Sequence, residues 1–173
     1  MKVGTHAQEP LEEIIRRKKR EIEDAGFSMW GYGGNTCHPM TMVQPFARVH
    51  AAASQPILLC MEPMTSKHFA EQVSAKEFSI DGAKWEPIPK GIDVLGSRFA
   101  LCIDTLYEVE AHLQLADTRV ALGSSKGKNG RDYIRGHVDK ACLEVVSTGP
   151  ADTEPVEIGL VASVIEPYAV LLR

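Results

Sequence analysis

Residues 107–115, YEVEAHLQL, carry the pattern that decides the fold of this chain. Mostly apolar side chains at the odd positions alternate with polar side chains at the even positions, which is the period of a β-strand. A strand with one apolar and one polar face favours antiparallel pairing in a sheet that exposes one face to water. The pattern therefore predicts that residues 57–173 are mostly β.

Several other segments have the length and the apolar content of strands. They cover residues 57–61, 98–103, 118–122, 132–138, 141–147, 156–165 and 168–172. We expect residues 118–122 to pair with 107–115, from which a two-residue break separates them. Asp81 to Lys84 predicts a tight hairpin turn, and Glu166-Pro167 predicts a turn between the last two strands.

Residues 10–25 predict the clearest helix. Pro10 suits a helix start and Gly26 suits a stop. Residues 11, 14, 15 and 22 form a narrow apolar stripe that can pack on a sheet. The basic run at 16–20 points all around the helix axis and has carboxylates four residues away on either side. We interpret this run as a solvated helix face rather than as a nucleic-acid site.

The elements together predict a single domain of the α+β class over residues 1–173. Its N-terminal helix packs on a mixed, mainly antiparallel sheet or open barrel of about seven or eight strands. Residues 26–56 form an irregular segment in this prediction, with a short helix from Pro45 to Ala53. A second short helix is expected from Thr65 or Ser66 through Val73.

Composition excludes several classes of protein. Hydrophobic residues make up 44% of the chain and charged residues 24%, which is ordinary for a globular domain. The net charge of −4 makes nucleic acid an unlikely partner, although a local basic patch could still bind it. No apolar run is long enough to span a bilayer, and residues 1–10 lack the apolar core of a signal peptide. Four cysteines without a C-x-x-C motif fit a reducing compartment. We therefore expect a cytoplasmic protein that does not bind a membrane.

Residues 26–46 contain four glycines and four aromatic residues without regular periodicity. Trp30 and Tyr32 could stack on a base or a sugar ring, and Gly33 and Gly34 would allow close approach of the backbone. The structural alternative is that the aromatic side chains fill the edge of the core.

The loop at 123–131, GSSKGKNGR, superficially resembles a phosphate-binding loop. It lacks the glycine spacing and the Lys-Ser/Thr ending of a true P-loop. It can still hold an anion in a looser arrangement of backbone N–H groups. The cationic side chains that would bind phosphate are Lys126, Lys128, Arg131 and Arg135. The alternative is a solvated hairpin tip.

If residues 132–138 form a strand, then Arg135, His137 and Asp139 share one face. His137 could then act as a general base that Asp139 orients. The alternative is a solvated strand face with internal ion pairs.

Cys37-His38 offers a second source of catalytic groups. Cys37 could act as a nucleophile if folding brings a base near it, whereas the alternative is a turn set by His38-Pro39. No spacing of cysteine and histidine matches a zinc site, so no metal is expected. The G-x-S-x-G, H-E-x-x-H and G-x-G-x-x-G motifs are absent, and the sequence identifies no cofactor.

These observations give three hypotheses of function. The first is a non-catalytic module that binds an anionic small molecule, plausibly a nucleotide, in a cavity shared by residues 30–38 and 126–139. The second is a small hydrolase or transferase that uses Cys37, or His137 with Asp139. The third is a protein-interaction subunit, which could also form a homo-oligomer through a sheet edge.

Overall fold

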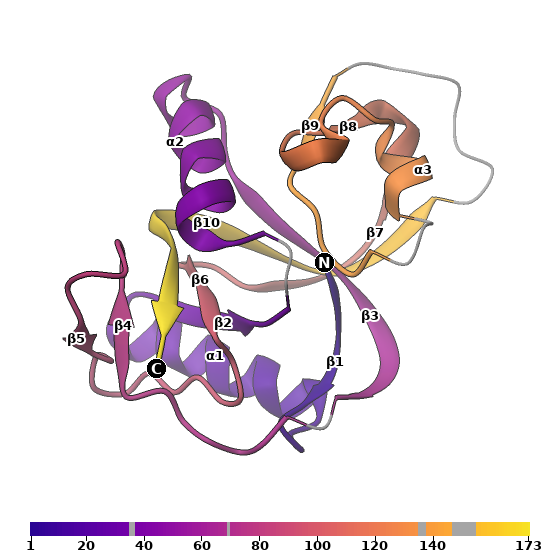
Figure 1. Ribbon diagram of the computed structural model, residues 1–173. Helices are drawn as coiled ribbons and strands as arrows, with labels where there is room; N and C mark the ends of the chain where they lie inside the picture. The colour runs from indigo at the N-terminus through magenta and orange to yellow at the C-terminus, as the bar shows by residue number, and fades with distance from the viewer. Residues whose placement is uncertain (35–36, 69, 135–137, 147–154) are drawn as a thin grey trace.

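The protein has an α+β fold in a computed structural model, which describes residues 1–34, 37–68, 70–134, 138–146 and 155–173 (Figure 1). Helix α1 (Leu11–Ala25) packs on a curled, mixed and mostly antiparallel sheet of eight strands. A separate sheet of two strands lies at one end of the large sheet. The predicted fold class is confirmed.

Strand β10 (Val156–Leu172) is the centre of the large sheet. Its first half pairs with β3 (Leu58–His68) and β7 (Tyr107–Leu113), and its second half pairs with β6 (Phe99–Ile103) and β4 (Glu77–Ser79). All four pairings are antiparallel. The register shifts between Val164 and Ala169, where Tyr168 has a φ of 68°. The prediction of a turn at Glu166-Pro167 is therefore wrong. The two predicted strands are one long strand, and an irregularity within it changes the strands with which it pairs.

The remaining strands of the large sheet extend these pairings. β1 (Lys2–His6) runs parallel to β3, and β2 (Ser28–Tyr32) runs antiparallel to β6. β4 and β5 (Glu86–Pro87) form the predicted hairpin, in which the Asp81 carboxylate accepts the backbone N–H groups of residues 83 and 84. This confirms the hairpin and gives its turn a physical cause.

The segment at 26–56 is far more regular than the sequence predicts. It contains β2, a π-helical turn η1 (Pro39–Val43) and helix α2 (Gln44–Ala52), which agrees with the short helix expected there. The buried Gln44 amide anchors α2, because its Nε2 donates to the carbonyl oxygens of Ile80 (2.9 Å) and Ala169 (2.8 Å). Expecting irregular structure at 28–32 was wrong because β6 offers a fully buried strand with which these residues pair.

Three other predicted elements are wrong. Residues 65–68 continue β3 beside β1 instead of starting a helix. β8 (Thr118–Val120) pairs with β9 (Leu143–Val145), not with β7, after a short 3-10 turn η2 (Leu115–Asp117). A second 3-10 turn, η3 (Gly123–Ser125), leads to helix α3 (Gly130–Ile134), where a strand over 132–138 was expected.

The Asn129 side chain explains why α3 is helical. Its Oδ1 accepts the backbone N–H of Arg131 at 3.0 Å, and its Nδ2 donates to the Ala116 carbonyl oxygen at 3.1 Å. The first bond caps the start of the helix and the second ties that start to η2. Capping therefore decides the conformation of a segment that has a strand-like composition.

One predicted solvated face is partly buried. Lys18 and Glu21 on α1 are only 2% and 4% exposed, and the Lys18 Nζ lies 2.9 Å from the Glu21 carboxylate. That carboxylate also accepts the Ser28 hydroxyl and the backbone N–H of Asp93. Burial lowers the pKa of Lys18 to about 8, although the Glu21 carboxylate opposes the shift. This buried polar network fixes α1 to β2 and to the loop before β6.

No helix in the described part of the chain is long and apolar enough to cross a membrane.

Candidate functional site

A cavity of about 850 Å³ lies between α2, the large sheet and the small β8–β9 sheet. Figure 1 shows α2 on one side and the β8, β9 and α3 unit on the other. Phe46 and His50 enter the wall from α2, and apolar side chains of β3, β9 and β10 form part of the remainder. A volume of this size accommodates a small-molecule ligand.

The strand that decides the fold also helps to build this cavity. Within β7 and the residues after it, Leu113 and Leu115 line the wall, whereas Tyr107 at the other end is 62% exposed. The alternation of residues 107–113 correctly predicts an antiparallel strand. Along this strand Val109 and Leu113 are half-buried, and Leu113 borders the cavity.

Polar groups stand at separate places in the apolar wall. His50 on α2 links across to β9, since its Nε2 lies 3.3 Å from the Glu144 carboxylate. Its Nδ1 lies 2.6 Å from the Gln55 amide oxygen. Elsewhere the wall carries two lysines, Lys2 and Lys140, and the carboxylates of Glu62 and Asp139. The lining thus contains charges of both signs and does not form a basic pocket.

Two thiols from distant parts of the chain meet on the cavity wall. Cys37 lies between β2 and η1 and has a φ of 58°, while Cys142 directly precedes β9. The two thiols are hydrogen-bonded to each other, and the backbone of Cys142 also contributes a hydrogen bond. The hydrogen bond from Cys142 lowers the pKa of Cys37 to about 7, and the nearby Lys140 cation adds to this effect against the opposing effect of burial. The same hydrogen bond, followed by burial, raises the pKa of Cys142.

The aromatic-glycine segment contributes less to the cavity than the sequence predicts. Trp30 is only 5% exposed and belongs to the core, so its ring is not available for stacking on a ligand. Tyr32 does line the cavity, but its hydroxyl donates to the Cys37 carbonyl oxygen at 2.8 Å. Gly33 has open space around it, and Gly34 has a φ of 90° and lies against the Lys140 side chain. The structure therefore agrees better with the alternative that the aromatic side chains fill the edge of the core.

The His38 ring packs edge-on against Phe99, with 5.2 Å between the ring centroids. The residue is otherwise exposed, and its role as a base for Cys37 stays a prediction.

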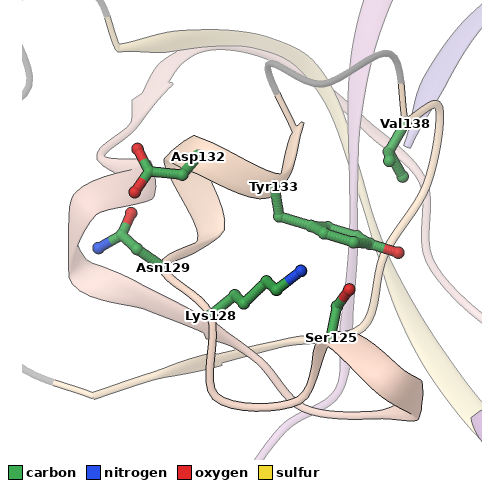
Figure 2. Close-up of a pocket in the computed structure, with 6 residues that line it drawn as sticks. All are labelled: Ser125, Lys128, Asn129, Asp132, Tyr133 and Val138. Atoms are coloured by element: carbon green, nitrogen blue, oxygen red, sulfur yellow. The ribbon is translucent and has the colours of Figure 1, made fainter.

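The basic loop borders a second, smaller pocket of about 470 Å³. Figure 2 shows the Lys128 side chain extending between the Tyr133 ring and the Ser125 hydroxyl, while the Asp132 carboxylate points away from them. Arg131 forms an ion pair with Asp132 at 3.3 Å, and Lys126 is exposed and lies outside the lining. Of the three predicted phosphate-binding cations that the structure describes, Lys128 alone lines this pocket.

The first residues of the segment expected to form the catalytic strand belong to helix α3 instead. Arg135 and His137 lie outside the described residues. Asp139 lines the large cavity, where its carbonyl oxygen accepts the Lys2 backbone N–H at 2.8 Å. Val138 borders both pockets. The structure thus brings residues 32 and 37 beside residues 138–142, whereas the lysines of the basic loop face elsewhere.

Sequence reasoning missed Cys142, Lys140 and the His50–Glu144 contact. Cys142 lies in an apolar run, in which a cysteine is usually a small buried hydrophobe. The signal that was available is that Cys142 follows Lys140 closely, since a nearby cation favours a thiolate. Nothing in the spacing pairs Cys142 with Cys37. The described residues contain no group of three or more metal-binding side chains.

Comparison of the chain with protein-family models, with curated proteins and with solved structures finds no match in any of the three. Three features of the structure can therefore indicate a function: the large cavity, the thiol pair on its wall and the pocket at the basic loop.

Proposed function

We propose that the protein is a non-catalytic module that binds a small, largely apolar molecule in the large cavity. The observation that carries this proposal is a cavity of about 850 Å³ whose wall is mainly aliphatic, with Phe46 as an aromatic contact. Binding sites for small molecules typically combine such a wall with a few fixed polar groups. Filling the cavity removes apolar ligand surface from water and provides the driving force.

The polar groups of the wall favour a ligand that carries a polar but not strongly anionic group. Lys2 and Lys140 could donate hydrogen bonds to an anionic oxygen, but the acidic residues Glu62, Asp139 and Glu144 border the same space. A simple anion would therefore meet repulsion as well as attraction. The His50 ring and the Gln55 amide supply hydrogen-bonding partners for a hydroxyl or carbonyl group.

Fluorescence titration with N-phenyl-1-naphthylamine, an uncharged apolar probe, tests this proposal. We expect saturable, blue-shifted emission on addition of the full chain. Ala141→Trp places an indole in the cavity wall and should weaken binding at least tenfold, which corresponds to about 1.4 kcal/mol.

Ala83→Trp is the matched control, because residue 83 lies in the exposed hairpin turn far from the cavity lining. This variant should bind the probe like the unmodified chain. The proposal fails if the unmodified chain does not bind the probe saturably, or if both tryptophan variants bind it equally well.

A second candidate is the anionic ligand that the basic loop predicts, plausibly a nucleotide. The observation that favours it is the convergence of the Lys128 amine, the Ser125 hydroxyl and the Tyr133 ring on one pocket (Figure 2). An amine and a hydroxyl can hold a phosphate oxygen while an aromatic ring packs on a base. In this candidate Tyr133 takes the stacking position that was expected for Trp30 or Tyr32.

Adenosine diphosphate at low salt is the probe for this second candidate. It should raise the melting temperature of the chain, and added salt should remove the shift. Lys128→Ala should abolish the shift, whereas Lys126→Ala should keep most of it, because Lys126 does not line the pocket. Equal effects of the two substitutions would point to non-specific attraction by the loop.

We also propose a cytoplasmic location. All four cysteines are free thiols, which fits the reducing compartment that the sequence predicts.

A further inference from the structure

The thiol pair on the cavity wall is the feature of the molecule that ligand binding leaves unexplained. Cys37 and Cys142 come from segments far apart in sequence, and the fold packs Cys142 against the core cluster that contains Cys37, where the two thiols interact. Both also line the large cavity. A packed core needs no such contact, since a buried thiol is normally surrounded by apolar side chains.

The two thiols have different surroundings that suit different chemical steps. Cys142 donates its proton to the sulfur of Cys37, and the Lys140 cation lies near enough to stabilise negative charge there. Cys37 is thus the sulfur that carries the negative charge. The thiolate is the nucleophilic form of a cysteine, so Cys37 is the one that reacts first.

The other two cysteines lack these partners. Burial raises the pKa of Cys60, and burial raises that of Cys102 to about 12. Cys60 nevertheless lines the same cavity as the pair, whereas Cys102 does not. Cys60 is therefore a natural control for a cysteine that is exposed to the cavity but has no thiol partner.

We propose that Cys37 and Cys142 form a reversible dithiol–disulfide pair that is oxidised by a small hydroperoxide entering the cavity. The Cys37 thiolate attacks the outer oxygen of the hydroperoxide, the O–O bond breaks, and the alkoxide that leaves takes up a proton. This step converts Cys37 to a sulfenic acid. The Cys142 sulfur then attacks the Cys37 sulfur, the Cys142 proton and the sulfenic hydroxyl leave as water, and the disulfide forms.

The overall reaction consumes two thiols and one hydroperoxide and yields a disulfide, an alcohol and water. Two electrons pass from the sulfurs to the peroxide oxygens. A dithiol reductant reverses the change by thiol–disulfide exchange. This inference does not depend on the proposed apolar ligand, because it requires only that a small oxidant reaches the cavity wall.

Hydrogen peroxide in stoichiometric amount, added to the reduced full chain, tests the proposal. After unreacted thiols are blocked, peptide mapping should find a Cys37–Cys142 disulfide and free Cys60 and Cys102. The Cys37 thiol should be lost at least tenfold faster than the Cys60 thiol. Dithiothreitol should restore all four thiols. The unmodified chain is used here, so a folding defect cannot explain a negative result.

Two substitutions separate the steps. Cys142→Ser removes the second sulfur, so Cys37 should stop at the sulfenic acid and be labelled by dimedone. Cys102→Ala removes a thiol that does not line the cavity and should leave formation of the disulfide unchanged. The proposal is overturned if Cys37 pairs with Cys60, if oxidation spreads equally over the cysteines, or if Cys142→Ser yields no sulfenic acid at Cys37.

Discussion

At the scale of single residues, the molecule buries a charged side chain at a position where the sequence pattern suggests exposure to solvent. Lys18 follows Ile14 by four residues and precedes Ile22 by four, so it lies on the apolar stripe of α1. This spacing was the signal that it would be buried, but the adjacent basic residues concealed it. What the sequence could not supply is the partner of Lys18 beyond the helix, the carbonyl oxygen of Asp93, to which its Nζ donates at 2.6 Å.

The buried carboxylate of Glu21 gives a stability prediction. Glu21→Ala should lower the free energy of unfolding by about 3–5 kcal/mol, because it leaves the Lys18 charge buried without its anion. Glu13→Ala on the same helix removes only the exposed contact with Arg16 and should cost at most about 1 kcal/mol. Urea unfolding at pH 7 measures both, and similar losses in the two variants would contradict the assignment of a stabilising buried network.

The Cys37 thiol gives a prediction of pH dependence. Its pKa is lowered to about 7 by the hydrogen bond from Cys142, so the thiolate persists to lower pH than for an ordinary cysteine. The rate of alkylation by iodoacetamide, followed at Cys37 by mass spectrometry, should reach half its maximum near pH 7.

The control for this pH profile removes the Cys142 thiol, which donates the hydrogen bond to Cys37. Cys142→Ala should move the midpoint upward by about one pH unit or more, because the charged form of Cys37 loses its hydrogen bond. Cys102 should remain unreactive over the same range, since its pKa is raised to about 12. An unchanged midpoint in Cys142→Ala would show that the pair does not set the reactivity of Cys37.

At the scale of elements, a strand could be predicted where a residue pattern repeats. A helix could not be predicted where the hydrogen bond of a single side chain decides the conformation. The alternation at 107–113 is enough to identify β7. Asn129-Gly130 has the composition of a hairpin tip, yet Asn129 caps α3 through a bond to a backbone group. The partner of β8 was also beyond prediction, because β9 reaches it from a distant part of the chain. Local patterns do not specify such pairings.

Gly130 tests how tightly the small sheet is joined to α3. A Cβ atom at this position would lie 1.9 Å from the Thr118 hydroxyl oxygen, which donates to the Leu115 carbonyl oxygen at 2.7 Å. Gly130→Ala should therefore destabilise the chain by about 1–3 kcal/mol and raise amide hydrogen exchange in β8 and α3. Gly33→Ala, which has open space around it, should leave both measurements nearly unchanged.

At the scale of the whole molecule, the sheet was predictable and the cavity was not. Strand patterns in residues 57–173 and the helix pattern at 10–25 are together sufficient for the α+β class, because apolar periodicity reports which residues face a core. The cavity exists because α2 and the β8–β9 unit leave space between them over the sheet. Its wall joins Tyr32 and Cys37 with Lys140 and Cys142, and no local pattern in the sequence indicates that these residues meet.

The position of β10 has a consequence for how the protein is made. β10 follows β3, β4, β6 and β7 in sequence and is the antiparallel partner of all four. During synthesis on a ribosome, the β1–β3 and β2–β6 pairs can assemble early, but the edges meant for β10 remain open until residues 156–172 have emerged. Nascent chains that stall before this point would present unpaired strand edges, which is the condition that recruits chaperones and promotes aggregation.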